Sequence, residues 1–454
     1  MPAAGGQVII VGGGIAGLSA AYDLSKAGIA HTLIEKRPRL GGVIQTSQWD
    51  DCVLEFGPDS FLSAKPEAMA LIRELGVEAD VIGSNDAERV TYILRNGHLT
   101  RLPEGTTMFV PTNPAAMLAS PLVGWGTKVR MGLEFLRGPA TFPDRSVSEF
   151  VTDHFGRETL DYLAEPLLSG VYGGDPDRLS VASVLPRFVE MERTNGSLAR
   201  ALIKSRTTRT EPLFRTLKSG LGCLVDKLGA SANVVHGSVD AIERRETGGF
   251  RVRVASEAGG DWMDAEHVIM ACPAWVGGDL LCDIDGRLAA LLRMIPYTSS
   301  AIASLIFDAA DFDGQRAGTG FLVPRVERRQ IMACTFVGTK FPHRVPAGKI
   351  ALRCFFGGSN DAVLERSDDQ LIALACQELR DILGLTATPI FSGISRWPRS
   401  MAQYVVGHGV RLQEIETRAA AVPGLYLAGN AYTGIGIPDC IRTGRKAAAK
   451  IITS

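Results

Sequence analysis

The sequence has no excess of either charge and no long apolar run. Its 48 Lys and Arg residues are balanced by 49 Asp and Glu residues, so the formal net charge is −1. Proteins that bind nucleic acid usually carry a strongly basic surface, and we therefore expect no nucleic-acid partner. The most apolar early stretch, residues 8–22, is interrupted by glycines and followed by Asp23 and Lys26. A membrane span needs roughly 20 apolar residues, so no transmembrane helix is expected.

The sequence also lacks the cysteine spacing of a metal site or a disulfide framework. Its eight cysteines are scattered, with no C-x-x-C pair and no group of histidines beside them. This distribution is typical of buried thiols in a reduced intracellular protein, and we expect no metal ligand among them. The first residues contain no cationic segment ahead of an apolar run, so a secretory signal is not expected. We expect a cytoplasmic protein.

A β-α-β unit is predicted at the start of the chain. Residues 8–11 form a short β-branched run, residues 15–27 have helical spacing and end before Gly28, and residues 31–34 form a second strand. Such a unit is the building block of a doubly wound parallel sheet, which indicates an α/β fold. The whole chain of 454 residues is long enough for two or three domains.

The loop between this first strand and helix has the spacing G-x-G-x-x-G. Gly12 permits the tight turn, Gly14 lets the backbone approach a pyrophosphate, and Gly17 lets the helix pack against the strand. Glu35 ends the second strand, where its carboxylate can accept hydrogen bonds from ribose hydroxyls. Strand, glycines, helix and acid together favour a nucleotide site over a simple glycine turn. The motif alone does not separate FAD from NAD.

Two further segments resemble FAD-binding parts of the amine oxidase and phytoene desaturase superfamily. Residues 39–46 (RLGGVIQT) resemble its paired-glycine segment, which lies along the FAD diphosphate. Residues 424–430 resemble the strand and loop that return to the FAD phosphates, and residues 434–439 lead into a last helix. The partial positive charge at that helix N-terminus would favour the anionic reduced flavin. No second G-x-G-x-x-G follows a strand, so we expect electrons to leave to oxygen or another acceptor, without a nicotinamide domain.

Three more segments resemble signatures of the oxygen-dependent porphyrinogen oxidases. They are residues 55–60 (EFGPDS), 166–176 (PLLSGVYGGDP) and 434–445 (GIGIPDCIRTGR), and the resemblance spans essentially the whole chain. It implies the six-electron oxidation of protoporphyrinogen IX or coproporphyrinogen III in haem biosynthesis, with O2 as acceptor and H2O2 as product. FAD performs the difficult chemistry in such an enzyme, so we expect no catalytic side chain and no metal.

The resemblance also implies a domain plan. It consists of a Rossmann-like FAD-binding domain of the glutathione-reductase/hydroxybenzoate-hydroxylase type, an α+β substrate domain, and a helical insertion that associates with membrane in some members. The expected FAD-binding domain comprises residues 1–85, 219–285 and 397–454. The expected substrate domain and helical insertion comprise residues 86–110 with 286–396, and 111–218, respectively. Contact with the inner face of the cell membrane and the oligomeric state stay open.

Individual site residues follow from the same resemblance. We expect the porphyrinogen to contact Ser169, Gly170, Leu322, Thr335 and Phe355. Ordinary core packing is the alternative for each of these taken singly. The residues expected to contact FAD are Gly12, Gly14, Ile15, Ala16, Gly17, Glu35, Lys36, Gly41, Gly42, Gly57, Pro58, Asp59, Ser60, Val239, Trp397, Gly429, Ile435, Gly436 and Ile437.

One position departs from the family pattern. Plant and animal members have an arginine for a substrate propionate four residues before the segment Arg95-Asn96-Gly97, and this chain has Thr91 there. Residues 102–105 and 110–112 resemble the bacterial coproporphyrinogen-oxidising branch, whose substrate carries four carboxylates. The sequence does not decide between the two porphyrinogens. An amine oxidase or phytoene desaturase-like flavoenzyme, and a flavin-binding protein without oxidase activity, are the alternatives.

Overall fold

A five-stranded parallel sheet assembles from three distant parts of the chain. The computed structural model describes residues 7–205, 211–255, 260–312, 317–358 and 361–454. The strand order in this sheet is β12-β2-β1-β16-β22, and every neighbouring pair is parallel. Its strands are β1 (Val8–Val11), β2 (His31–Glu35), β12 (Val234–His236), β16 (His267–Met270) and β22 (Leu425–Leu427). The predicted first β-α-β unit and the α/β fold class are therefore confirmed.

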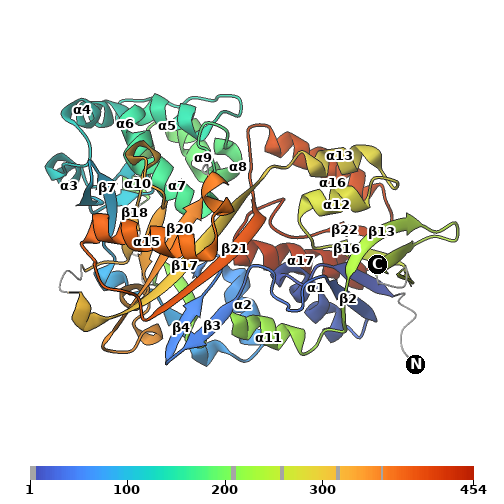
Figure 1. The fold of residues 1–454 in the computed structure, drawn as a ribbon. Helices are drawn as coiled ribbons and strands as arrows, with labels where there is room; N and C mark the ends of the chain where they lie inside the picture. The colour runs from blue at the N-terminus through green and yellow to red at the C-terminus, as the bar shows by residue number, and fades with distance from the viewer. Residues whose placement is uncertain (1–6, 206–210, 256–259, 313–316, 359–360) are drawn as a thin grey trace.

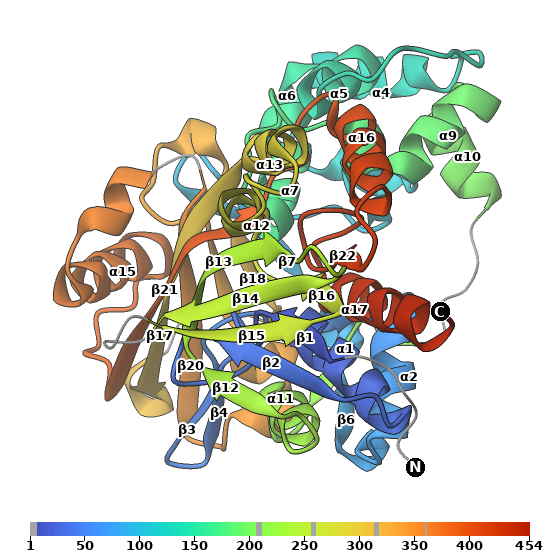
Figure 2. The ribbon, with the colours of Figure 1, turned by 90° about the vertical axis from the view of Figure 1, so that its right-hand side faces the viewer.

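Helices cover the parallel sheet, and two of them bring the ends of the chain together. Helix α1 (Ile15–Lys26) follows β1, and α17 (Ile437–Ile452) packs beside it, as Figure 2 shows. The same layer contains α2 (Pro66–Glu74) and α11 (Gly222–Gly229). Buried apolar side chains of β1, α1 and α17 share one core, so the amino-terminal and carboxy-terminal segments form a single unit around this sheet.

An antiparallel ribbon of three strands follows β12. It consists of β13 (Ser238–Arg244), β14 (Phe250–Ala255) and β15 (Asp261–Ala265). Residues 234–242 are divided between two strands, because the chain changes sheets at Gly237, where the amide donates to the carbonyl of Glu35. A side chain at Gly237 would also meet Val254 at 2.4 Å. β15 was not predicted, because polar and apolar residues do not alternate in its sequence DWMDA.

A seven-stranded sheet is the second large sheet of the fold. Its order is β21-β17-β20-β19-β18-β7-β8. The strands are β7 (Thr91–Arg95), β8 (His98–Arg101), β17 (Tyr297–Asp308), β18 (Gly320–Leu322), β19 (Ala333–Phe336), β20 (Lys349–Gly357) and β21 (Phe391–Ala402). Strands β7 and β8 form a hairpin that turns at Asn96-Gly97. Helix α15 (Asp368–Leu383), drawn in orange in Figure 1, covers one face of this sheet.

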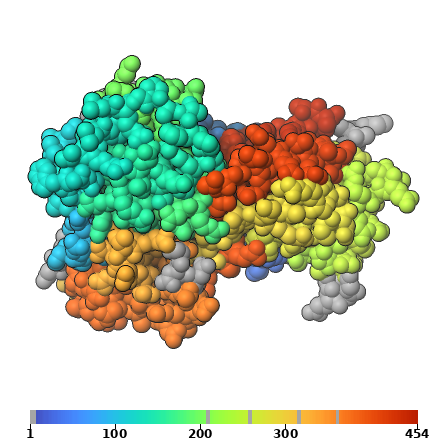
Figure 3. Space-filling model, turned by 90° about the horizontal axis from the view of Figure 1, so that it is seen from above, coloured from blue at the N-terminus to red at the C-terminus, as the bar shows by residue number. Residues whose placement is uncertain are grey.

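The chain between these sheets forms a block of helices. The block contains α3 (Pro114–Ala119), α4 (Trp125–Glu134), α5 (Val147–Phe155), α6 (Arg157–Thr159), the π-helical turn η3 (Leu160–Ala164), α7 (Glu165–Tyr172), α8 (Val181–Val184), α9 (Pro186–Asn195) and α10 (Leu198–Lys204). In Figure 3 it is teal and green and lies beside the yellow and red segments. Those segments contain α12 (Ala274–Leu280), α13 (Gly286–Arg293) and α16 (His408–Ala420). Across the described residues, every helix is too short or too polar to span a lipid bilayer.

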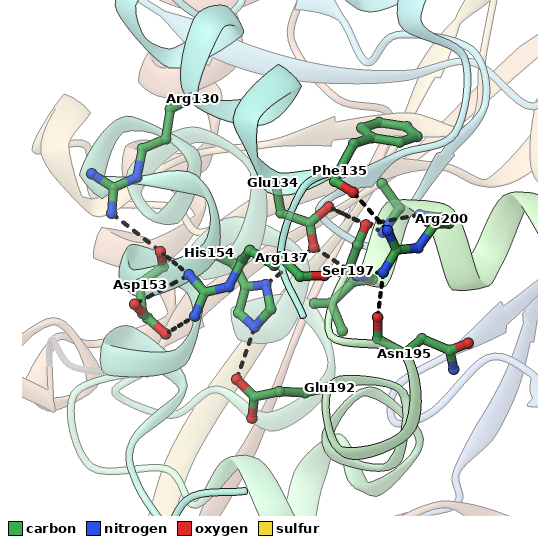
Figure 4. Close-up of polar contacts among 12 residues, drawn as sticks. Arg130, Glu134, Phe135, Arg137, Asp153, His154, Glu192, Asn195, Ser197 and Arg200 are labelled. Atoms are coloured by element: carbon green, nitrogen blue, oxygen red, sulfur yellow. Dashed lines mark hydrogen bonds and ion pairs between the residues drawn. The ribbon is translucent and has the colours of Figure 1, made fainter. Parts of the chain in front are cut away.

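A buried ion-pair network holds three helices of this block together. Both ring nitrogens of His154 on α5 are engaged, with Glu134 of α4 at 3.1 Å and Glu192 of α9 at 2.9 Å, as Figure 4 shows. Burial opposes the charged form of His154, but the two carboxylates outweigh it and raise the pKa of the imidazole. Asp153 lies nearby and pairs with Arg137. The imidazole nitrogens and carboxylate oxygens of this cluster are paired with one another. We therefore interpret the cluster as structural.

Short elements complete the fold. They are a hairpin of β3 (Thr46–Trp49) and β4 (Cys52–Glu55), a small sheet of β5 (Phe61–Leu62), β11 (Phe214–Leu217) and β6 (Val81–Gly83), a pair of β9 (Thr106–Thr107) and β10 (Val110–Pro111), and α14 (Val337–Lys340).

Candidate functional site

The glycine loop after β1 leaves an open cradle at the start of α1. Gly12 has φ +111°, and a Cβ there would lie 2.7 Å from the carbonyl oxygen of Ala271. A Cβ at Gly17 would lie 2.0 Å from the Gly12 oxygen, so α1 packs directly on the turn. A Cβ at Gly14, in contrast, would meet nothing within 4 Å. This open space lies at the helix N-terminus, where the first N–H groups have no partner within the helix.

Glu35 is held in a fixed orientation beside this cradle. Its Oε2 accepts a hydrogen bond from the Gly13 amide at 2.7 Å, and its Oε1 accepts from the Arg37 amide at 2.8 Å. The side chain is buried, and each carboxylate oxygen retains a second lone pair. Glu35 can therefore accept hydrogen bonds from two ribose hydroxyls without moving. Lys36, which follows it, is exposed.

The paired-glycine segment lies against the same cradle. The Gly41 amide donates to the Gly13 carbonyl at 2.8 Å. Gly42 has φ +59°, and a Cβ there would be 3.2 Å from the Cα of Gly14. Further along, a Cβ at Gly57 would overlap the Val43 carbonyl oxygen at 1.8 Å. Three segments that were predicted to contact FAD are thus in direct contact with one another.

The carboxy-terminal segment reaches this surface through α17. A Cβ at Gly429 would meet nothing within 4 Å, and the Gly429 amide donates to Thr443 Oγ1 of α17 at 3.0 Å. Gly436 is the N-cap of α17 without a capping side chain, so Ile437 begins a helix whose first amides have no partner within the helix. Ile435, just before them, is half buried. A second uncapped helix end therefore lies on the same unit as the α1 cradle.

Trp397 of β21 joins this surface to the seven-stranded sheet. Its indole N–H donates to the carbonyl of Phe56 at 2.7 Å, and the guanidinium groups of Arg37 and Arg39 lie over its ring at 5.6 and 5.5 Å. Val239, at the start of β13, is half buried next to Gly237, whose amide reaches β2. The predicted FAD residues at both ends of the chain and in its middle therefore converge on one side of the parallel sheet.

Asp59 differs from its neighbours because its carboxylate is already paired inside the protein. Lys340 lies 2.8 Å from it, Arg353 lies 3.2 Å away, and the Ser60 hydroxyl donates to it. Burial opposes the charged form, but the two cations hold the pKa of Asp59 well below its usual range. Pro58, before it, is half buried. The side chains of Asp59 and Ser60 therefore position the 55–60 segment through this ion-pair network.

The predicted substrate residues share one face of the seven-stranded sheet. Leu322, Ala333 and Phe355 are direct neighbours across β18, β19 and β20, and Thr335 pairs with Arg353 two residues along. Because side chains alternate between faces, these residues point to one side. Leu322, Thr335 and Phe355 are only half buried. The residues of the opposite face, including Phe321, Cys334 and Phe356, are fully buried under α15.

Helix α7 lies against this half-buried face. A Cβ at Gly170 would come 3.6 Å from Leu322 Cδ2, which is ordinary contact. Gly170 is exposed, and its neighbour Ser169 is half buried. Four of the five predicted substrate residues are thus brought together directly, and Ser169 adjoins them. Thr91 belongs to the same face, because it pairs with Gly320 beside Thr335.

Two buried charged residues at this face were not predicted. Glu165 accepts the Ser169 hydroxyl at 2.8 Å, and burial raises the pKa of its carboxyl. Arg353 is 2% exposed and donates to the carbonyl of Gly57. Sequence spacing contained a signal for both, because Glu165 precedes Ser169 by one helical turn and Arg353 precedes Phe355 by two strand positions.

The arrangement fits a dinucleotide that carries a diphosphate and a ribose. Open space lies at Gly14 and Gly429, uncapped helix ends lie beside it, and a fixed carboxylate stands at the end of β2. These features, next to a half-buried sheet face, are those of a flavin-dependent oxidoreductase. The chain belongs to the flavin containing amine oxidoreductase family, whose model matches residues 15–452. FAD as cofactor and an FAD-dependent oxidase are therefore confirmed predictions.

Similar proteins carry porphyrinogen oxidase names. The chain is 33% identical to coproporphyrinogen III oxidase from Bacillus subtilis, with 98% of each chain covered. It is 28% identical to chloroplastic protoporphyrinogen oxidase from Oryza sativa, with 98% of this chain and 87% of that protein covered. A crystal structure from Exiguobacterium sp. 255-15, provisionally assigned as a protoporphyrinogen oxidase, matches with TM-score 0.87 and 31% identity over 98% of each chain. Putrescine oxidase shares the fold at TM-score 0.73 and 17% identity.

Proposed function

We propose that this chain is an FAD-dependent porphyrinogen oxidase of haem biosynthesis, with O2 as acceptor and H2O2 as product. The observation that carries the proposal is the half-buried face of Leu322, Thr335 and Phe355 with Gly170 beside it. A bulky tetrapyrrole needs a broad apolar surface, whereas a small amine needs only a narrow pocket. The names of relatives that match over nearly the full chain support the same function.

Coproporphyrinogen III is the better-supported substrate. Relatives from bacteria named coproporphyrinogen III oxidase are 29% to 33% identical to this chain, and the chloroplastic proteins named protoporphyrinogen oxidase are 27% to 28% identical. Thr91 lies on the substrate face where plant and animal members have a propionate-binding arginine. A substrate that carries four carboxylates accounts for the absence of that arginine.

The protein's own contribution is binding and orientation. When bound, FAD supplies the acceptor for a hydride from a bridging carbon of the porphyrinogen. Glu35 and the ends of α1 and α17 would hold its ribose and diphosphate. Leu322 and Phe355 offer the macrocycle an apolar surface, and Gly170 adds no side chain beside Leu322.

Anaerobic mixing with each porphyrinogen tests this function. We expect coproporphyrinogen III to bleach the flavin absorbance rapidly and protoporphyrinogen IX to do so more slowly. Putrescine and a polyene serve as controls for the amine oxidase and desaturase alternatives. Bleaching by either control, or by no compound at all, would contradict the proposal.

The domain limits are proposed on the strand composition of the two large sheets. All five parallel strands fall within residues 1–85, 219–285 and 397–454, which supports that division for the FAD-binding domain. The limit between residues 396 and 397 lies inside β21, so we move it to follow Ala402. Residues 111–218 include the helical block.

We also propose a cytoplasmic location with peripheral contact between α4 and the inner face of the membrane. Trp125, Val129 and Leu133 follow one another at helical spacing and are 71%, 62% and 59% exposed. The Lys128 ammonium lies 4.6 Å from the Trp125 ring, so a cation accompanies the apolar stripe. Apolar side chains beside basic ones favour an anionic bilayer surface.

Vesicle sedimentation tests the membrane contact. The double variant Trp125→Ser/Val129→Ser should lose binding to vesicles that contain phosphatidylglycerol. Val410→Ser is a matched control, because Val410 is 75% exposed on the distant helix α16. Equal binding by the double variant and the unmodified protein would refute the contact.

A further inference from the structure

A buried carboxyl stands directly behind the residues that face the substrate. Glu165 is 5% exposed and begins α7, immediately after the π-helical turn Leu160–Ala164. A π turn contains more residues than an α turn, so it changes which side of the helix the following residues occupy. Here Glu165 lies on the buried side, one turn before Ser169. An isolated buried acid is costly and needs a specific reason.

The hydrogen bonds of Glu165 point in two directions. Its Oε1 accepts the Ser169 hydroxyl at 2.8 Å, and Ser169 adjoins the exposed Gly170 at the sheet face. Its Oε2 accepts the backbone amide of Arg325 at 3.1 Å, just beyond β18. Glu165 therefore links α7 to the strand that carries Leu322. One of its oxygens is hydrogen-bonded to the residue directly before Gly170, which lies beside Leu322.

Glu165 also lines a cavity of about 250 Å³ that is open to solvent. Its lining carries several charged side chains and reaches exposed residues, and its volume is large enough for several water molecules. The lining includes Arg157, Leu160, Asp161, Glu165, Arg325 and Val326. A path therefore leads from Gly170 at the substrate face, through Ser169 and Glu165, to this cavity and to solvent.

We propose that Ser169 and Glu165 form a proton relay that removes the pyrrole N–H proton of the porphyrinogen during each two-electron step. The inference rests on the proposed function and adds residues to it. Glu165 does not touch the substrate and acts through Ser169, so it is a positioning residue. It also holds the proton that Ser169 passes on.

The step balances in atoms and electrons. A bridging C–H bond breaks and its electron pair leaves with the hydrogen as hydride, for which bound FAD is the acceptor. The pyrrole N–H bond breaks, its proton passes to Ser169 Oγ, and the Ser169 hydroxyl proton passes to Glu165 Oε1. The substrate has then lost one hydride and one proton, and gains a C=N bond. O2 takes up the hydride equivalent and one proton as H2O2, and the Glu165 proton leaves through the cavity.

The charge environment suits a carboxyl that changes protonation. Burial raises the pKa of Glu165 above its ordinary value, while hydrogen bonds from Ser169 and the Arg325 amide oppose that rise. Asp161 raises this pKa further and the Arg325 side chain lowers it, but that side chain is also paired with Asp175 at 2.9 Å. Arg157 pairs with Asp161 at the other side of the cavity. A raised pKa brings the acid closer to the operating pH, where a proton acceptor is most effective.

Anaerobic flavin reduction by coproporphyrinogen III, followed as a function of pH, tests the relay. The wild-type rate should fall as pH drops through the Glu165 pKa. Glu165→Gln should slow the rate by about 100-fold and remove this pH dependence, with half-saturation changed less than about twofold. Ser169→Ala should give the same pattern, and carries the test if Glu165→Gln fails to fold.

The chain offers a matched control. Glu378 is also 5% exposed, accepts the backbone amide of Gln330 at 2.9 Å, and has a carboxyl pKa raised by burial. It lies on α15, on the opposite side of the sheet from Leu322. Glu378→Gln should keep the wild-type rate and pH profile.

An infrared titration gives a second readout that needs no turnover. Protein with ¹³C-labelled glutamate should show a buried carboxyl that titrates above the ordinary range of glutamate and is missing in Glu165→Gln. A Glu165→Gln variant with the wild-type rate and pH profile would overturn the relay alone. A wild-type protein whose flavin is reduced by no porphyrinogen would overturn the proposed function and the relay together.

Discussion

The second residue of α1, Ala16, and Gly444 of α17 are in direct backbone contact. A Cβ at Gly444 would lie 2.0 Å from the Ala16 carbonyl oxygen, which no side chain can tolerate without a shift of the helix. This contact unites the cradle at the start of α1 with the helix that follows Gly429 and Gly436. The two parts of the predicted FAD site depend on each other through it.

Gly444→Ala should therefore weaken both stability and FAD binding. The added methyl group forces α17 away from α1, at a cost of about 1–3 kcal/mol. Thermal unfolding and the flavin-to-protein absorbance ratio measure the two effects. Gly409→Ala in α16 is the control, because its Cβ would meet nothing within 4 Å. A Gly444→Ala protein with full flavin and an unchanged Tm would contradict the argument.

Glu35 provides a second test of the cradle. Glu35→Gln keeps the size of the side chain but removes the charge that accepts the Gly13 and Arg37 amides. Hydrogen bonds to a charged group contribute about 1.5–3 kcal/mol, so FAD should bind roughly 10- to 100-fold more weakly. Titration of apoprotein with FAD measures this, with the exposed Glu416→Gln as control. Equal affinity in the two variants would exclude Glu35 from ribose binding.

The sequence predicted the local parts of this architecture well. The unit β1-α1-β2 was predictable because strand, glycine turn and helix are adjacent, and α15 was predictable from its apolar spacing and the Ser367 cap. The long strand β21 and helix α16 were missed. β21 contains Pro398 and many polar residues and is stabilised by pairing with β17, which lies about 90 residues earlier. Tertiary pairing of this kind leaves no local pattern.

The candidate site shows the same limit. The glycines and Glu35 are recognisable because phosphate and ribose binding impose fixed spacing. The spacing of Glu165 and Ser169 places both on one helix face, but it does not show that Glu165 is buried. The π-helical turn before it and the loop after β18 determine that burial. The pairing of Asp59 with Lys340 and Arg353 joins residues almost 300 positions apart, which spacing cannot reveal.

The network around His154 should make stability depend on pH. The pKa of His154 is raised in the folded protein, so its contribution is fully present below its unfolded pKa, about 6.5, and is lost as pH rises through the folded pKa. Wild-type protein should therefore unfold at lower urea concentration at about pH 9 than at about pH 6. His154→Gln breaks a buried pair, should cost about 3–5 kcal/mol at pH 6, and should lose most of this pH dependence.

His98, which is exposed on β8, supplies the matching control for this network. His98→Gln should unfold at the wild-type urea concentration at both pH values. If His154→Gln kept the wild-type pH dependence, another group would be responsible for it.

Gly170 tests whether the sheet face receives the substrate. Gly170→Leu fills the space opposite Leu322, whose Cδ2 would lie only 3.6 Å from a Cβ at position 170. Turnover should fall at least about 100-fold while FAD stays bound, because the bulk enters the substrate side only. Steady-state oxygen uptake and flavin absorbance measure the two properties. Gly286→Leu, at a position with open space around it, controls for the added leucine, and unchanged turnover in Gly170→Leu would exclude this face.

Thr91 tests how the substrate carboxylates are recognised. It pairs with Gly320 and lies on the same sheet face as Thr335, so an arginine there can reach a substrate carboxylate from the edge of the face. Thr91→Arg should lower KM for a porphyrinogen by about 10-fold with kcat unchanged, since a charged hydrogen bond adds uniform binding. Thr91→Gln has similar reach without charge and should leave KM near the wild-type value. If both variants changed KM equally, size and not charge would govern this position, and carboxylate binding would have to lie elsewhere on the face.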